Sequence, residues 1–211
     1  MDLDGVCFNF SQAFMSWVYR EHYDDVKYLQ SFIPSRYDFW ALWRDPNLDK
    51  EWFITRYGQF AAARGFYNNN HTLHGTGLTY WRLANQWGIP VAIVTARGTE
   101  FDQLDKDIHD QTTGWLYDEG LHHELILVTD PHDCKLEQLS NHLPYKDNSI
   151  LTVEDSLSNA QRYHDAGLTS VLVDRPWNQT TDPDHTFNTL SPLRQRDSDF
   201  VHQQTQVVHL P

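Results

Sequence analysis

The stretch Val91-Ala92-Ile93-Val94-Thr95 decides the fold, because short apolar runs of the same kind recur further along the chain. They lie at Leu125 to Val128, Ile150 to Val153 and Ser170 to Val173, with segments of helical character between them. Strands covered on both faces are nearly continuous in apolar residues, and strands that alternate with helices form parallel sheets. We therefore predict an α/β fold with a parallel sheet across residues 88–174.

Helices are expected between these strands. Apolar residues from Phe101 to Leu116 recur at roughly helical spacing, and Gly120 is placed to end that helix. Shorter helices are expected around Leu136 to Leu139 and around Ala160 to Tyr163. Ligands of open α/β sheets bind outside the carboxyl ends of the strands, so the side chains that follow the strands are the candidates for function.

The first part of the chain favours helices rather than strands. Phe10 to Val18 and Trp52 to Phe60 carry apolar residues at helical spacing, and Asn68 to Asn70 mark a loop after them. Leu78 to Trp87 suits the first helix of the α/β part, and the composition turns polar after Asn178. The predicted organisation is an α/β core over residues 1–8 and 71–178, a helical insert over residues 9–70 and a polar, partly ordered tail over residues 179–211.

The charge of the chain excludes several classes of partner. A formal net charge of −13 over 211 residues repels nucleic acid polymers and anionic lipid surfaces, which bind clustered Lys and Arg. A small phosphate ester stays compatible, because a bound divalent cation inverts the local field of an acidic pocket.

The cysteines and the hydropathy pattern predict a soluble, cytoplasmic protein without membrane contact. Cys7 and Cys134 provide neither a disulfide framework nor a zinc knuckle, and none of the 12 histidines has partners at convincing zinc spacing. No run approaches the roughly 18 apolar residues of a membrane span, and the N-terminus lacks a basic, hydrophobic leader.

Four polar groups stand at strand ends or helix starts. Asp2 and Asp4 alternate just before a glycine turn, so both carboxylates can face one ligand. Thr95 closes the first apolar run, Lys135 opens a helix, and Glu154-Asp155 closes the third run. Each group alone is weak evidence, because an isolated lysine is usually solvated and a threonine after a strand often caps a helix.

In this order and at these strand ends, the set resembles the four motifs of the haloacid dehalogenase (HAD) superfamily. These are an aspartate pair, a Ser or Thr, a Lys or Arg, and an acidic metal site, and the resemblance covers roughly residues 1–178. It implies a Rossmann-like core with a parallel sheet, a small helical cap insert, and a Mg²⁺-dependent phosphohydrolase. A dehalogenase of the same fold is disfavoured, because Asp4 supplies the second carboxylate that phosphate chemistry uses.

The resemblance also implies roles for the acidic residues. Asp2 is expected to be the nucleophile, and Asp4 the acid that protonates the leaving oxygen and later activates water. Asp2, Asp4 and Asp155 are the expected metal ligands, since Mg²⁺ prefers hard oxygen donors. Glu154 and Asn159 are expected to support these ligands through hydrogen bonds.

The phosphoryl oxygens are expected to lie against Thr95 and Lys135, because phosphoryl transfer depends mostly on positioning and charge stabilisation. Arg97 is a further candidate for this contact, and Lys146 is the alternative to Lys135.

The stretch from Val171 to Asn178 is similar to the end of the core in 5′(3′)-deoxyribonucleotidases and their phage and bacterial relatives. A nucleoside monophosphate is therefore the leading substrate, and a homodimer is compatible with this group. A phosphatase of another small metabolite and a non-catalytic binding protein are the alternatives. Aromatic residues of the helical insert suit either base stacking or simple packing: Phe39, Trp40, Trp43, Trp52 and Phe53.

One feature departs from the HAD pattern. Family members deliver the aspartate pair on a hydrophobic strand, whereas only Met1 precedes Asp2 in this sequence. We expect the absence of that strand to leave unpaired backbone groups and an apolar gap in the middle of the sheet. Either a start set too far downstream or a weakened, inactive relative accounts for this departure.

Overall fold

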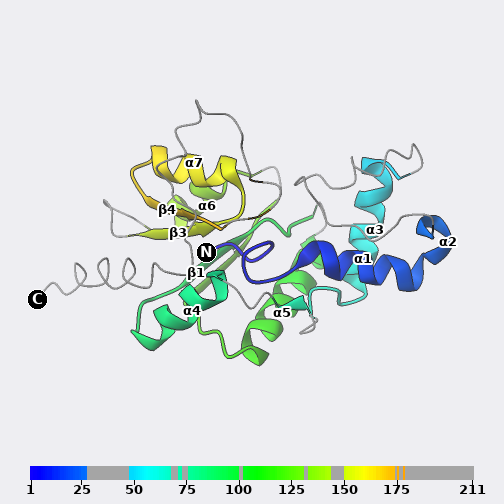
Figure 1. The fold of residues 1–211 in the computed structure, drawn as a ribbon, viewed down its shortest axis with the longest axis horizontal. Coiled ribbons are helices and arrows are strands. Elements are labelled where there is room, and N and C mark those ends of the chain that lie inside the picture. Colours follow the sequence, from blue (N-terminus) through cyan, green and yellow to red (C-terminus); the bar gives the residue numbers. More distant parts are fainter. Residues whose placement is uncertain are drawn as a thin grey trace, which may run out of the picture.

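The structure, a computed structural model, describes most of the chain up to residue 178 (Figure 1). The described residues are 1–27, 48–67, 71–72, 76–99, 102–130, 133–143, 150–173, 175 and 178. Lys146, the predicted tail over residues 179–211, and the aromatic residues Phe39, Trp40 and Trp43 lie outside these ranges.

The four predicted strands are present as short parallel pairs, which confirms a mixed α/β fold. They are β1 (Ala92–Thr95), β2 (Leu125–Val128), β3 (Leu151–Glu154) and β4 (Thr169–Leu172). Among the described residues, β1 pairs with β2 in one sheet and β3 pairs with β4 in another, so the single sheet that we predicted is divided in two.

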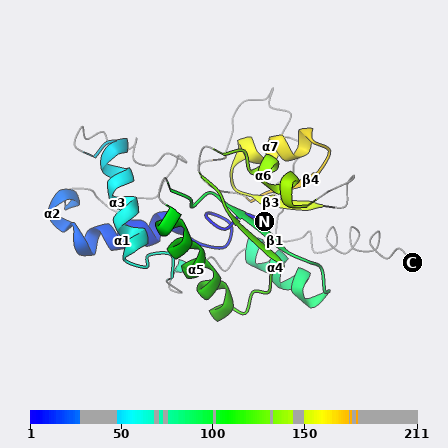
Figure 2. The same ribbon diagram turned by 180° about the vertical axis from the view of Figure 1, so that it is seen from behind.

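Met1 and Asp2 lie between the two sheets and bond to both. The Met1 amino group donates to the Ala92 carbonyl oxygen at 2.7 Å, and the Val94 amide donates to the Met1 carbonyl oxygen at 3.1 Å. On the other side, the Asp2 amide donates to the Val153 carbonyl oxygen at 3.0 Å. Both views show the N-terminus beside β1 and β3 (Figures 1 and 2). Met1 and Asp2 therefore bridge part of the gap that we expected between β1 and β3.

Four helices accompany the strands near the positions that apolar spacing predicts: α4 (Thr76–Gln86), α5 (Asp102–Asp118), α6 (Lys135–His142) and α7 (Leu157–Asp165). Helix α7 packs on β3 and β4, and α6 contacts α7 and β1. Helices α4 and α5 lie on the opposite side of the strands (Figures 1 and 2). The Ser156 hydroxyl accepts the Asn159 amide and so caps the start of α7 directly after the acidic end of β3.

The helical segments before residue 63 lie at the end of the molecule away from β3 and β4 (Figure 1). They are α1 (Phe10–Glu21), α2 (Tyr23–Val26) and α3 (Lys50–Ala62). Their aromatic side chains pack against one another: the Phe14 ring lies 5.2 Å from Phe53 and 5.6 Å from Phe60. For Phe53, the structure therefore favours packing over base stacking.

The two cysteines occupy different environments. Cys7 is buried in the core, and burial raises the pKa of its thiol to about 12. Cys134 is half-buried and takes the N-cap position of α6, and both thiols are free.

Within the ranges given above, every helix is too short or too polar to cross a lipid bilayer.

Candidate functional site

Three acidic side chains converge at the carboxyl ends of the strands. Asp2, Glu154 and Asp155 are all buried, and each offers an oxygen within 4.8 Å of the others. Glu154 is the last residue of β3, Asp155 follows it, and the backbone bond from Asp2 to Val153 places Asp2 alongside. We name Asp2, Glu154 and Asp155 the acidic triad. The sequence predicted this convergence of Asp2 with Asp155, but it assigned Glu154 a supporting position outside the ligand set.

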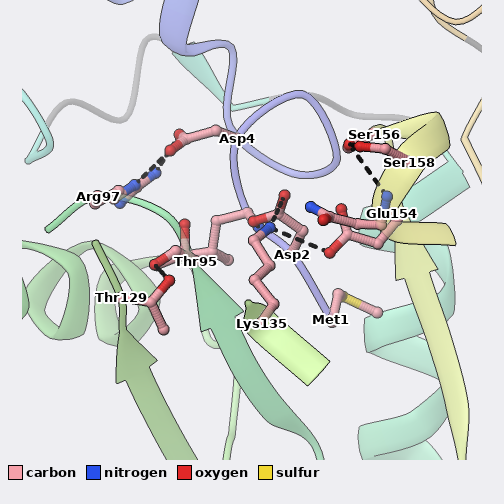
Figure 3. Close-up of polar contacts among 12 residues, drawn as sticks. Met1, Asp2, Asp4, Thr95, Arg97, Thr129, Lys135, Glu154, Ser156 and Ser158 are labelled. Atoms are coloured by element: carbon pink, nitrogen blue, oxygen red, sulfur yellow. Dashed lines mark hydrogen bonds and ion pairs between the residues drawn. The ribbon is translucent and has the colours of Figure 1, made fainter. Parts of the chain in front are cut away.

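Lys135 supplies a positive charge to the acidic triad from the first turn of α6. Its Nζ lies 2.5 Å from Asp2 Oδ2 and 3.1 Å from Glu154 Oε1, and the side chain is only 3% exposed. Burial raises the pKa of Glu154 well above its usual value, against the opposing influence of the Lys135 ammonium. The Lys135 ammonium therefore contacts the carboxylates of both Asp2 and Glu154 (Figure 3).

Unpartnered polar atoms mark the same place. Thr95 is fully buried, yet its Oγ1 has no hydrogen-bond partner among the described residues, and neither has Glu154 Oε2. Thr95 ends β1 next to Val94, which bonds to Met1, so the hydroxyl lies beside the start of the chain. Buried polar atoms without partners are uncommon, and they fit a site that binds an ion or a polar ligand.

Asp4 lies apart from the acidic triad and faces Arg97 instead (Figure 3). Arg97 Nη2 donates to Asp4 Oδ1 at 2.7 Å, and Arg97 Nε donates to Asp4 Oδ2 at 2.9 Å. Both carboxylate oxygens are therefore engaged. We had expected Asp4 to join Asp2 and Asp155 around a metal. In the structure, the ion pair with Arg97 holds the Asp4 side chain away from these two residues.

Arg97 is buried on every side. Its guanidinium lies 4.9 Å from the Phe8 ring centre and 4.6 Å from the Phe66 ring centre, and Nη1 donates to Thr112 Oγ1 at 3.0 Å. The donors of Arg97 thus point at Asp4 and Thr112. In this arrangement Arg97 binds a carboxylate of its own chain, whereas we had expected it to approach a phosphate.

Two asparagines lie close in sequence or in space to Asp155, the triad residue that follows β3. Asn159 lies in the first turn of α7, where its backbone amide donates to Ser156 Oγ at 3.5 Å. No hydrogen bond joins the Asn159 side chain to the acidic triad in the described part of the chain. Asn178, to which sequence reasoning gave no role, is buried and donates to the Asp155 carbonyl oxygen at 2.9 Å. The resemblance of the stretch ending at Asn178 was the only sign of its importance.

The donor chemistry of the acidic triad suits a hard divalent cation. Carboxylate oxygens are the ligands that Mg²⁺ and Ca²⁺ prefer, whereas zinc sites favour thiolates and imidazoles. Among the described residues, this buried group of carboxylates could hold a metal ion.

Comparison with known proteins adds no family to this description. No family model matches the chain, and no curated protein matches it. The function is therefore argued from the geometry of the site and from the motif resemblance.

Proposed function

We propose that this chain is a Mg²⁺-dependent phosphomonoesterase that forms an aspartyl-phosphate on Asp2. The observation that carries the proposal is the buried contact of Lys135 with both Asp2 and Glu154, with Asp155 in the same group of carboxylates. It supports a site in which the proposed nucleophile, a cation and the proposed metal ligands lie together. Their order along the chain is that of the HAD motifs.

The chain holds Asp2 in a fixed orientation for attack. The Leu3 amide donates to Asp2 Oδ1 at 2.8 Å, and Lys135 contacts Asp2 Oδ2. In the proposed reaction a carboxylate oxygen of Asp2 forms a bond to phosphorus, and the bond from phosphorus to the leaving oxygen breaks. Lys135 offsets the repulsion between the Asp2 carboxylate and the phosphate, and Thr95 Oγ1 offers a donor to a phosphoryl oxygen.

Asp2, Glu154 and Asp155 would hold the Mg²⁺ ion, which would supply the remaining charge neutralisation. The residues fit such an ion on two observations: the donor set consists entirely of carboxylates, and Glu154 Oε2 has no hydrogen-bond partner within the described ranges. Mg²⁺ usually keeps several waters, so three protein ligands suffice.

The proton for the leaving oxygen comes from Asp4 in this proposal, and the same carboxylate then activates water to release phosphate. As described, both Asp4 oxygens accept hydrogen bonds from Arg97. Asp4 must release at least one of them to serve the substrate. Its side chain is 24% exposed, which gives it access to the solvent side of the site.

The leading substrates are nucleoside monophosphates, by resemblance to the deoxyribonucleotidases. Another small phosphate ester is the alternative. The charge balance supports a small ester rather than a polymer. The chain carries a net charge of −13, and three of its acidic side chains are gathered in the triad.

A substrate panel tests this function. The purified chain is incubated with p-nitrophenyl phosphate and each nucleoside monophosphate, with Mg²⁺ and then with a chelator in excess. We expect phosphate release that requires Mg²⁺ and is abolished by Asp2→Asn. The matched control is Asp24→Asn, the same change at an aspartate on α2 whose side chain is 90% exposed. Absence of Mg²⁺-dependent release from every substrate, or an unaffected Asp2→Asn variant, would refute the proposal.

The closed pair between Asp4 and Arg97 favours a second candidate function, which is binding of a metal and phosphate without turnover. Calorimetry and the substrate panel together separate the two functions. A non-catalytic protein binds inorganic phosphate with Mg²⁺ present, as a phosphatase also does, but it releases no product from any ester.

A further inference from the structure

Two residues after β4, Arg175 and Asn178, bond to the two loops that carry the acidic triad. Asn178 is buried, with 7% of its surface exposed. Its Nδ2 donates to the Asp155 carbonyl oxygen at 2.9 Å and to the Val173 carbonyl oxygen at 2.7 Å. Its Oδ1 accepts the Arg175 amide at 3.0 Å. All the hydrogen-bonding groups of this one side chain are thus used to fix backbone.

Arg175 reaches the loop of Asp2. Arg175 Nε donates to the Gly5 carbonyl oxygen, and Gly5 adopts a positive φ of 73° in the loop that follows Asp2 and Asp4. The Asn178 amide donates to the Arg175 carbonyl oxygen at 3.1 Å, so these two residues are bonded to each other. Arg175 and Asn178 therefore contact the backbone on both sides of the acidic triad.

The Asp155 backbone lies just beyond the paired part of β3 and β4, where the strands no longer hold it. The last backbone bond between the loops after β3 and β4 runs from the Val173 amide to the Glu154 carbonyl oxygen at 2.7 Å. Asp155 is the first residue beyond it, so the Asn178 side chain holds its carbonyl group where the strand no longer does. A ligand whose backbone is held in place loses less freedom when a metal binds.

We propose that Asn178 is a positioning residue for the divalent metal, because its side chain fixes the backbone of Asp155 within the acidic triad. This inference rests on the metal site of the proposed function. It concerns metal affinity alone, so it does not depend on any rate of hydrolysis.

The chain contains a matched control in Asn85. Asn85 Nδ2 donates to the His122 carbonyl oxygen at 2.9 Å, and Asn85 Oδ1 accepts the His122 amide at 3.0 Å. Like Asn178, Asn85 therefore binds the backbone of a loop through its side chain. It lies near Val91 and Glu124, which precede β1 and β2, and therefore at the end of the strands opposite to the acidic triad.

The test is calorimetric titration of the full chain with Mg²⁺ alone. We expect Asn178→Ala to weaken Mg²⁺ binding about tenfold or more, as is usual when support of a metal ligand is lost. Asn85→Ala should keep the wild-type Kd within about twofold, although it also removes side-chain bonds to a loop backbone. Its loss of stability should be smaller, because the Asn85 bonds are exposed. Equal Kd values for Asn178→Ala and Asn85→Ala would overturn the inference and leave the proposed function standing.

A second variant covers the case in which Asn178→Ala does not fold. Asn178→Ser keeps one hydroxyl donor, and the same criterion applies to it below its melting temperature. A wild-type chain that binds no Mg²⁺ would overturn the metal site and this inference together.

Discussion

The guanidinium of Arg97 and the carboxylate of Asp4 form a two-pronged ion pair across 93 residues of sequence. The pair is asymmetric, because the Arg97 side chain has no exposed surface whereas that of Asp4 is 24% exposed. Tyr57 on α3 donates its hydroxyl to the Arg97 carbonyl oxygen at 2.8 Å, so the helical part of the chain contacts the same loop.

This asymmetry predicts unequal effects on stability. Asp4→Ala leaves the buried Arg97 guanidinium without a counter-charge. It should lower the free energy of unfolding by about 3 kcal/mol. Arg97→Met fills the space between Phe8 and Phe66 and leaves a carboxylate that water can reach, so its cost should be smaller. Urea unfolding of both variants measures the difference. Equal losses, or a larger loss for Arg97→Met, would contradict this account.

The proposed acid role of Asp4 predicts a dependence on the leaving group. Asp4→Asn should reduce kcat for an alkyl phosphate by roughly 100-fold or more, because a poor leaving group needs the proton. The loss should be much smaller for 2,4-dinitrophenyl phosphate, whose leaving group departs without one. Steady-state rates on the two esters decide the matter, and an equal loss on both would show that Asp4 does not act as the acid.

Lys135 competes with a metal for the same carboxylates, which predicts an unusual response to Mg²⁺. Lys135→Met leaves Asp2 and Glu154 buried without the ammonium and should lower the melting temperature in a chelator. Mg²⁺ should then raise the melting temperature of Lys135→Met by more than it raises that of the wild type. Thermal unfolding with and without Mg²⁺ measures this, with Lys106→Met on the exposed face of α5 as the control. A smaller gain for Lys135→Met would argue against a metal at the triad.

Two buried threonines separate function from stability. Thr95 Oγ1 has no partner among the described residues, so Thr95→Val should leave stability nearly unchanged while lowering kcat/KM by roughly 10- to 100-fold. Thr152 donates to Ser170 Oγ at 2.8 Å, so Thr152→Val should cost about 1 kcal/mol of stability and leave kcat/KM unchanged. Denaturant unfolding and steady-state kinetics on both variants test the pairing. A reversed pattern would mean that the Thr95 hydroxyl serves the fold.

His71 predicts a loss of stability in mild acid. Burial lowers its pKa below the usual 6.5, so the folded state binds fewer protons than the unfolded state as the pH falls through 6.5. The contribution of His71 to the free energy of unfolding should therefore decrease from about pH 7 to about pH 5, and His71→Gln should remove this contribution. Exposed His164→Gln is the control. Identical slopes for His71→Gln and the wild type would contradict the prediction.

The sequence predicted the α/β part well because its signals are local. Short runs of branched apolar residues mark each strand, and the polar residue after the run marks the edge where ligands bind. The strand pattern marks Asp155 in this way, whereas Asp2 and Lys135 were assigned to the same place through the resemblance to the HAD motifs. The structure brings the three side chains together.

The remaining details depend on contacts that no local pattern encodes. The ion pair of Asp4 with Arg97 follows from the burial of Arg97 between two phenylalanine rings, which only the tertiary fold creates. Glu154 enters the triad because its side chain, like that of Asp2, reaches Lys135. The division into two sheets could not be predicted either, since it depends on how far Met1 and Asp2 pair with their neighbours.

The contrast between the two cysteines gives the protein a built-in attachment point for a spectroscopic probe. The buried Cys7 thiol, with its pKa of about 12, should resist alkylation at neutral pH, whereas Cys134 is partly accessible. A maleimide fluorophore would then report from the residue next to Lys135, where occupancy of the neighbouring carboxylates can be followed as a change in emission without any engineered substitution.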